Sequence, residues 1–180
     1  MTTNNKLKHH IDVLLQDAHA TRINDVPENI NLAEKALKIS KEVKDKALIG
    51  KSLNQLSLYY MISSHFEKST LVSKEAINYF EALNDQQGIA DANYNIGSIY
   101  YKTTNYHLGL AHLVEALKIY REFKDYHKQS KVEKAVGTIY GYICDDSNAF
   151  SSFKRAIKIA RKVNDKNAES NVLTLCQDYF

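Results

Sequence analysis

Hydrophobic positions along the chain follow a helical spacing that is interrupted at regular intervals. The clearest stretch lies between residues 85 and 123, where the polar segment 102–105 separates two apolar series. The first series consists of Ile89, Ala92, Ile96, Ile99 and Tyr100, and the second of Leu110, Leu113, Ala116, Leu117, Ile119 and Tyr120. Spacings of three and four residues place each series on one face of a helix. The pattern predicts two antiparallel helices of about 17 residues, roughly 25 Å each.

The same pair of helices repeats along the chain with a period of forty residues. Alanines keep this period at Ala36, Ala76, Ala116 and Ala156, a small-residue series runs through Ser57, Gly97 and Gly137, and aspartates recur at Asp45, Asp85, Asp125 and Asp165. A fixed period in this range is typical of solenoids. We therefore predict one all-α repeat domain over residues 1–180, with units at about 5–45, 46–85, 86–125 and 126–165 and an extra helix at 167–180.

Both periodic series have a physical reason. Two helices approach closely only where one presents almost no side chain, so the alanines and glycines are predicted to be packing positions. Each periodic aspartate stands before the first helix of a unit. There its carboxylate can accept backbone N–H bonds and complement the positive end of the helix dipole, so we expect these aspartates to be N-caps.

Composition argues against some classes of protein but does not identify a ligand. The 180 residues carry a formal net charge of +3 from 24 basic and 21 acidic side chains, which gives no indication of a nucleic-acid partner. The first fifteen residues lack the apolar segment of a signal peptide, and no stretch approaches the roughly 20 apolar residues of a membrane span. These features predict a cytoplasmic protein with no membrane partner.

Motifs of catalysis and metal binding are not found in the sequence. The seven histidines have no metal-ligand spacing, and there is no phosphate loop, GxSxG elbow or dinucleotide fingerprint. Cys144 and Cys176 form no CxxC pair, which argues against a disulfide framework or a zinc site. Cys176 falls in an apolar helical pattern and is expected in the core. We predict no enzyme activity, no catalytic residue, no metal and no cofactor.

The residues of the third unit resemble the tetratricopeptide repeat family. The matching positions are Asn95, Ile96, Gly97, Tyr100, Tyr101, Tyr106, Ala116 and Leu117, whereas Asn93 and Gly109 depart from the family pattern. The resemblance implies a right-handed α-solenoid of four helix-turn-helix repeats plus a C-terminal helix, which binds a peptide or partner protein in a concave groove. Repeat units of 40 residues, instead of the usual 34, resemble those of repeat arrays in bacterial signalling proteins.

The resemblance also implies which residues line the groove, at the outward positions of each first helix. They are Lys51, Asn54 and Leu58; Asp91, Tyr94, Ser98, Tyr101 and Lys102; and Lys131, Lys134 and Tyr142. Tyrosines supply contact area at low entropic cost, and lysines can pair with acidic side chains or a carboxylate. The basic run Lys154, Arg155, Lys158, Arg161 and Lys162 is interpreted as a solvated convex face.

Two functions are compatible with the resemblance to this family. The first is a non-catalytic interaction scaffold, the sensory or docking region of a larger bacterial signalling protein. The second is an intracellular receptor for a peptide or small-molecule signal. The apolar face of the last helix, with Leu173 and Phe180, leaves three alternatives open: the helix caps the array, it pairs two copies into a homodimer, or the natural polypeptide continues.

Overall fold

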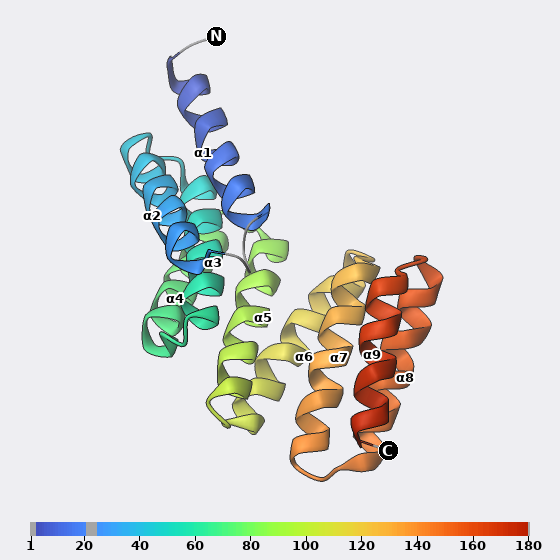
Figure 1. Cartoon of the computed structure of the whole chain (residues 1–180). Coiled ribbons are helices and arrows are strands. Elements are labelled where there is room, and N and C mark those ends of the chain that lie inside the picture. The colour runs from blue at the N-terminus through green and yellow to red at the C-terminus, as the bar shows by residue number, and fades with distance from the viewer. Residues whose placement is uncertain (1–2, 21–24, 180) are drawn as a thin grey trace. The chain divides into compact units, whose positions relative to one another are not determined.

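The computed structural model describes residues 3–20 and 25–179, and within these ranges every regular element is an α-helix (Figure 1). The helices are α1 (Thr3–Ala20), α2 (Val26–Glu42), α3 (Lys46–Ile62), α4 (Phe66–Glu81), α5 (Gln86–Lys102), α6 (Tyr106–Glu122), α7 (Tyr126–Tyr142), α8 (Asp146–Lys162) and α9 (Lys166–Tyr179). The backbone contacts divide the chain into two compact units, Met1–Ile99 and Tyr100–Phe180. The sequence-based division into one domain with repeat units stays a prediction.

Every turn after α2 has the same backbone geometry. One residue per turn adopts a left-handed conformation with φ between 54° and 61°, and these residues recur every twenty positions: Lys44, Ser64, Asn84, Thr104, Lys124, Cys144 and Asn164. The amide after each one donates to the carbonyl five residues earlier, as Asp45 N does to Ser40 O at 3.2 Å. This is the Schellman ending of a helix. Because none of the seven is glycine, the turns are encoded without the usual residue signal.

Aspartate caps begin the first helices, as the sequence predicts. Asp45 accepts from the amides of Ala47 and Leu48, both at 3.1 Å. The carboxylates of Asp85, Asp125 and Asp165 each accept from the amide three residues later, at 2.9 to 3.1 Å. The prediction of periodic N-caps is therefore confirmed.

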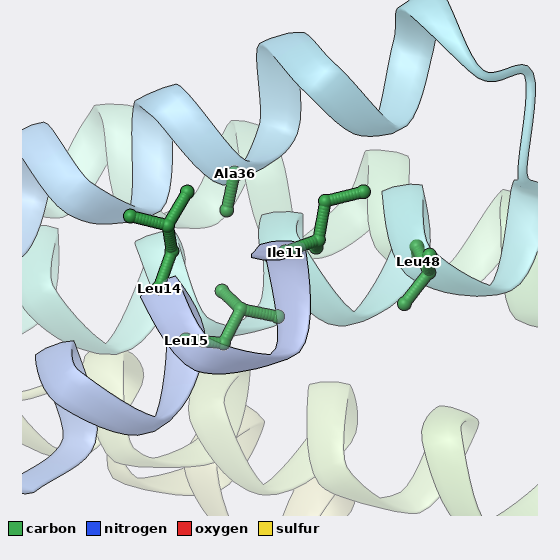
Figure 2. Close-up of a cluster of buried hydrophobic side chains, with 5 residues drawn as sticks. All are labelled: Ile11, Leu14, Leu15, Ala36 and Leu48. Atoms are coloured by element: carbon green, nitrogen blue, oxygen red, sulfur yellow. The ribbon is translucent and has the colours of Figure 1, made fainter. Parts of the chain in front are cut away.

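The core of the first unit contains an apolar cluster and a group of buried serines. Ile11, Leu14 and Leu15 of α1 cluster with Ala36 of α2 and Leu48 of α3 (Figure 2). Farther along, three serines are fully buried. Their hydroxyls bond to one another: Ser57 Oγ lies 3.1 Å from Ser69 Oγ and also bonds to Ser73 Oγ, and Ser69 Oγ donates to Ser57 O at 2.6 Å.

A phenylalanine ring between two glycines explains another close approach in this unit. Phe80 of α4 is buried, and a Cβ added to Gly50 of α3 or to Gly88 of α5 would lie 2.7 Å or 2.4 Å from its ring. Such distances are shorter than any real carbon contact, so both positions require glycine unless the ring moves.

The second unit uses the same principle. In α8, Ala149, Phe153 and Ala156 are fully buried and cluster with Val172 of α9. A Cβ on Gly137 of α7 would meet the Phe153 ring at 2.7 Å. The four periodic alanines, Ala36, Ala76, Ala116 and Ala156, are each 0% exposed, and Gly97 is also buried. In each unit, the core therefore forms where neighbouring helices come close.

Candidate functional site

Groove residues predicted in the first unit lie on α3 and α5. Lys51 is exposed, while Asn54, Leu58, Asp91, Tyr94 and Ser98 are half-buried. The Asn54 side chain is held by Asn95, whose Nδ2 donates to its Oδ1 at 2.8 Å and to its backbone oxygen at 3.0 Å. This amide pair joins the two helices, and it leaves Asn54 oriented before any ligand arrives.

Tyr94, a predicted groove residue, has a phenol with a shifted pKa. Burial raises the pKa of its phenol, and a hydrogen bond with Ser98 opposes the shift. The Ser98 hydroxyl also donates to the Tyr94 carbonyl at 2.8 Å. Tyr94 is half-buried, so part of its side chain is open to a ligand while its phenol stays neutral.

A cluster of three tyrosines forms in the second unit and includes two of the predicted groove residues. The rings of Tyr101 and Tyr142 meet edge to face with centroids 5.5 Å apart, and Tyr106 stacks on Tyr142 at 5.8 Å. Tyr101 and Tyr106 are 6.4 Å apart. Tyr142 keeps 53% of its surface exposed. We call Tyr101, Tyr106 and Tyr142 the tyrosine cluster.

Cationic side chains accompany the tyrosine cluster on α7 and at the end of α5. Lys131, Lys134 and Tyr142 are separated by three and eight residues, which places them along one side of α7. Lys131 and Lys102 are exposed and Lys134 is half-buried. Lys134 precedes Tyr142 by eight residues, about 12 Å along α7, so an extended ligand could meet both the apolar ring and the charge.

Sequence reasoning missed Tyr106 as a site residue and Asn95 as the partner of Asn54. Tyr106 begins a second helix, which the groove argument did not include. Its place follows from the turn, because the left-handed Thr104 brings the start of α6 back to the end of α5. The only available signal was the aromatic pair on either side of a predicted turn. Asn95 matched the family pattern, but a pattern match does not reveal a hydrogen-bond partner.

The basic run on α8 is not simply a solvated face. Arg155 Nε donates to the buried Glu133 of α7 at 3.0 Å, and Lys162 Nζ lies 3.9 Å from the centre of the Tyr126 ring. Cys176, expected in the core, is half-buried beside α8. The expectation was wrong because the apolar face of α9 is incompletely covered.

Two kinds of feature are absent from the described residues. No group of three or more His, Cys, Asp or Glu side chains is placed to hold a metal ion among residues 3–20 and 25–179. Over the same described ranges, no helix is both long and apolar enough to cross a membrane.

The helices, their identical turns and their capping aspartates define an α-helical repeat protein. The family model of the tetratricopeptide repeat matches residues 88–162. This part of the chain is similar to the tetratricopeptide repeat family, as the sequence predicts. No curated protein sequence matches the chain.

Solved structures extend the likeness to the whole chain. The apo form of RapI is 19% identical with a TM-score of 0.83, covering 96% of this chain and 63% of its own. A Rap protein complexed with competence and sporulation factor is 17% identical with a TM-score of 0.84, covering 97% and 54%. The Rap conjugation gene regulator of plasmid pLS20, in complex with a Phr peptide, is 14% identical with a TM-score of 0.88, covering 99% and 48%.

At these identities the likeness shows the fold, an all-α solenoid of helix-turn-helix repeats. The chain spans between about half and two thirds of the length of these three structures.

Proposed function

We propose that this chain is a non-catalytic interaction scaffold that binds a peptide or partner protein on the surface carrying the tyrosine cluster. The observation that supports this most directly is the cluster itself. Three tyrosines pack ring to ring, yet Tyr142 leaves half of its surface in solvent. Rings fixed against one another lose little entropy when a ligand covers them, which is the property of aromatic anchors in recognition surfaces.

The expected ligand is an extended or helical peptide segment with an apolar side chain and a nearby carboxylate. The apolar side chain would lie on the exposed Tyr142 ring. The carboxylate, from an acidic residue or a chain end, would pair with Lys134 or Lys131. Charge pairs of this kind favour correct orientation and fast association more than they add affinity.

Within this proposal, the chain acts as the sensory or docking region of a larger bacterial signalling protein. The fold likeness to Rap structures, whose chains extend beyond the matched part, supports it. A second candidate is a receptor for a peptide signal, favoured by the likeness to a structure in complex with a Phr peptide. A receptor would be stabilised by its ligand alone, by about 2.7 kcal/mol at a hundredfold excess over the dissociation constant. A scaffold would require its protein partner.

Affinity capture with matched variants tests the proposal. We expect a partner that binds the wild-type chain and is lost from a Tyr142→Ser, Lys134→Glu variant, with affinity for the purified partner at least about tenfold lower. The control is Tyr126→Ser, Lys118→Glu, which removes a tyrosine and a lysine of the same unit outside the cluster. Circular dichroism establishes that both variants fold. Equal capture by all three proteins would refute binding at the tyrosine cluster.

A further inference from the structure

On α7, a lysine and a tyrosine lie at the two ends of a face made of small residues. With 3.6 residues per turn, Lys134, Ala135, Thr138, Gly141 and Tyr142 fall within an arc of about 120°. The three residues between the ends are half-buried, and none has a side chain larger than that of threonine. We call these five residues the α7 face. It shares Tyr142 with the tyrosine cluster and extends from there to the middle of the helix.

Lys134 supplies the charge on the α7 face. It is half-buried, and its ammonium group forms no ion pair or hydrogen bond with the residues that the structure describes. Lys131, one turn earlier, is exposed. A half-buried side chain has less freedom to lose than an exposed one, so pairing it with a carboxylate costs less side-chain entropy. We therefore assign a ligand carboxylate to Lys134 rather than to Lys131.

The distance along α7 sets how far apart the two contacting groups of a ligand must be. Lys134 precedes Tyr142 by eight residues, which is about 12 Å along the helix axis. An extended chain advances about 3.3 Å per residue, and its side chains alternate between two sides. Residues four positions apart therefore face the same way and are about 13 Å apart. Spacings of two and six give about 7 and 20 Å, and a spacing of three turns one side chain away.

An extended ligand suits this face better than an α-helical one. A docked helix buries a stripe of apolar side chains in a hydrophobic groove. Between Lys134 and Tyr142, this side of α7 presents Ala135, Thr138 and Gly141, which offer little apolar area. Because these residues are small, an extended main chain can approach them closely. A helical ligand would also need about eight residues between its apolar anchor and its acid to cover the same distance.

The combination of charge and ring on the α7 face is not a general feature of the repeat. Forty residues before Lys134, α5 has Tyr94. Forty residues before Tyr142, it has Lys102, so the order of charge and ring along the helix is reversed. In α3, neither of the corresponding positions carries a charged residue. A ligand that matches α7 in this way would therefore not match the other two helices equally well.

Resting on the proposed function, we propose that the α7 face selects an extended peptide segment in which an apolar residue and an acidic residue are four positions apart. The apolar side chain lies on the Tyr142 ring, and the carboxylate pairs with Lys134. The residue midway between them faces α7 and must be small, because it lies against Thr138. The main-chain direction is free, so the acid can precede or follow the apolar residue. This spacing rule can fail while the tyrosine cluster still binds a partner.

Designed peptides with the acid at different distances test the spacing. The probe contains the segment Phe-Thr-Ser-Thr-Glu between Gly-Ser flanks, with a neutral dye at the amino end and an amide at the other, so that no chain-end carboxylate is present. Matched peptides place the glutamate two, three or six positions from the phenylalanine, and each has a glutamine version. A further pair, in an alanine-rich helical background, has a spacing of eight. Binding to the full chain is measured by fluorescence polarisation in both sequence directions.

The quantity of interest is the coupling between Lys134 and the acid of the peptide. It is obtained from the four affinities of the wild-type and Lys134→Met chains for the glutamate and glutamine peptides. At a spacing of four we expect a coupling of about three- to fivefold, the size of a favourable surface ion pair, and less than about twofold at two, three or six. Lys118→Met on α6 is the matched control and should show no coupling. Tyr142→Ser should weaken binding of every extended peptide at least about tenfold.

Three results would overturn the spacing rule. The first is no saturable binding of the spacing-four peptide in either direction up to about 1 mM, the range of very weak complexes. The second is a coupling that is independent of spacing or that appears with Lys131→Met instead of Lys134→Met. The third is tighter binding of the helical peptide. If Tyr142→Ser still weakens binding in the second or third case, the proposed function stands without the rule, whereas no effect of Tyr142→Ser on any bound peptide would count against both.

Discussion

Glu133 is a buried carboxylate whose charge partners all come from outside its own helix. Its side chain is 1% exposed, and its two oxygens accept from Arg121 of α6 at 2.7 Å and from Arg155 of α8 at 3.0 Å. Both arginines are about half exposed, with side-chain exposures of 55% and 48%. Each ion pair therefore joins the buried carboxylate to a solvated guanidinium group. Removing the carboxylate should affect stability differently from removing the guanidinium groups.

The structure predicts that removing the arginines lowers the free energy of unfolding much more than removing the carboxylate does. Removing both guanidinium groups, with Arg121→Ala and Arg155→Ala together, leaves a buried carboxylate unpaired and should lower the free energy of unfolding by about 3–5 kcal/mol. Replacing the carboxylate with Glu133→Leu strands no buried charge, since both arginines reach water. The lost pairs are worth up to about 1 kcal/mol each, and a buried leucine offsets this by about 1.5–3 kcal/mol. We expect stability to stay within about 1 kcal/mol of wild type or to rise slightly.

Urea unfolding followed by circular dichroism measures the difference. The equivalent position in an earlier repeat supports the leucine variant, because Leu53, eighty residues before Glu133, is 1% exposed in its own core. The denaturant slope must match among the proteins for the midpoints to be compared as free energies. If Glu133→Leu destabilises the chain as much as the double arginine variant does, charge attraction dominates over desolvation and the reasoning is wrong.

Three further predictions concern the repeats and their turns. Gly88→Ala should lower the free energy of unfolding by about 1–3 kcal/mol through overpacking, because its Cβ would lie 2.4 Å from the Phe80 ring, and calorimetry will detect it. Thr104→Asn should raise the melting temperature by about 2–4 °C, since a β-branched residue is poorly suited to φ 61°. The pKa of Asp45 is lowered from 3.8, first by its hydrogen bond with Lys8, so its stabilising contribution is present above pH 3.8 and is lost as pH falls through the folded value. Unfolding experiments between pH 2 and 7 should therefore show less acid loss in Asp45→Asn.

Controls separate these effects from general helix changes. Gln87→Ala lies beside Gly88 on an exposed position of the same turn and should be neutral or slightly stabilising. Asn84→Gly tests the turn argument, because Asn84 already suits its φ of 54° and should gain nothing. A gain at Asn84 comparable to that at Thr104 would contradict the turn argument. An acid loss in Asp45→Asn equal to that of wild type would exclude Asp45 as its source.

The fold could be predicted because one structural element is repeated at a fixed distance. Periodic alanines and aspartates identified the helix contacts and the caps, and Asp45 and Asp85 accept the predicted amide bonds. The left-handed residue in each turn was not predicted, because its position holds lysine, serine, threonine and cysteine as well as asparagine. Turn geometry here is imposed by the packing of the helices on either side, which local residue preferences do not report.

Details of the site could be predicted only in part. The resemblance to the repeat family implied the outward positions of the first helices, and two of them, Tyr101 and Tyr142, meet in the structure. The surroundings of Tyr94 could not be predicted, because neither burial of a phenol nor the bond with Ser98 can be read from helical spacing. Glu133 was missed for the same reason, since its arginine partners are 12 and 22 residues away.

In the proposed function, the ligand is bound by residues that depart from the repeat. Tyr142 stands where the two preceding repeats have Lys102 and Ile62, and Tyr101 stands where the next repeat has Gly141. A repeated position must serve packing in every unit, so selection for a ligand can act only where packing leaves the side chain free. The tyrosine cluster satisfies that condition, because it forms at the ends of helices and leaves 53% of Tyr142 exposed. Restoring the repeat with Tyr142→Lys should therefore leave the free energy of unfolding nearly unchanged while it removes binding.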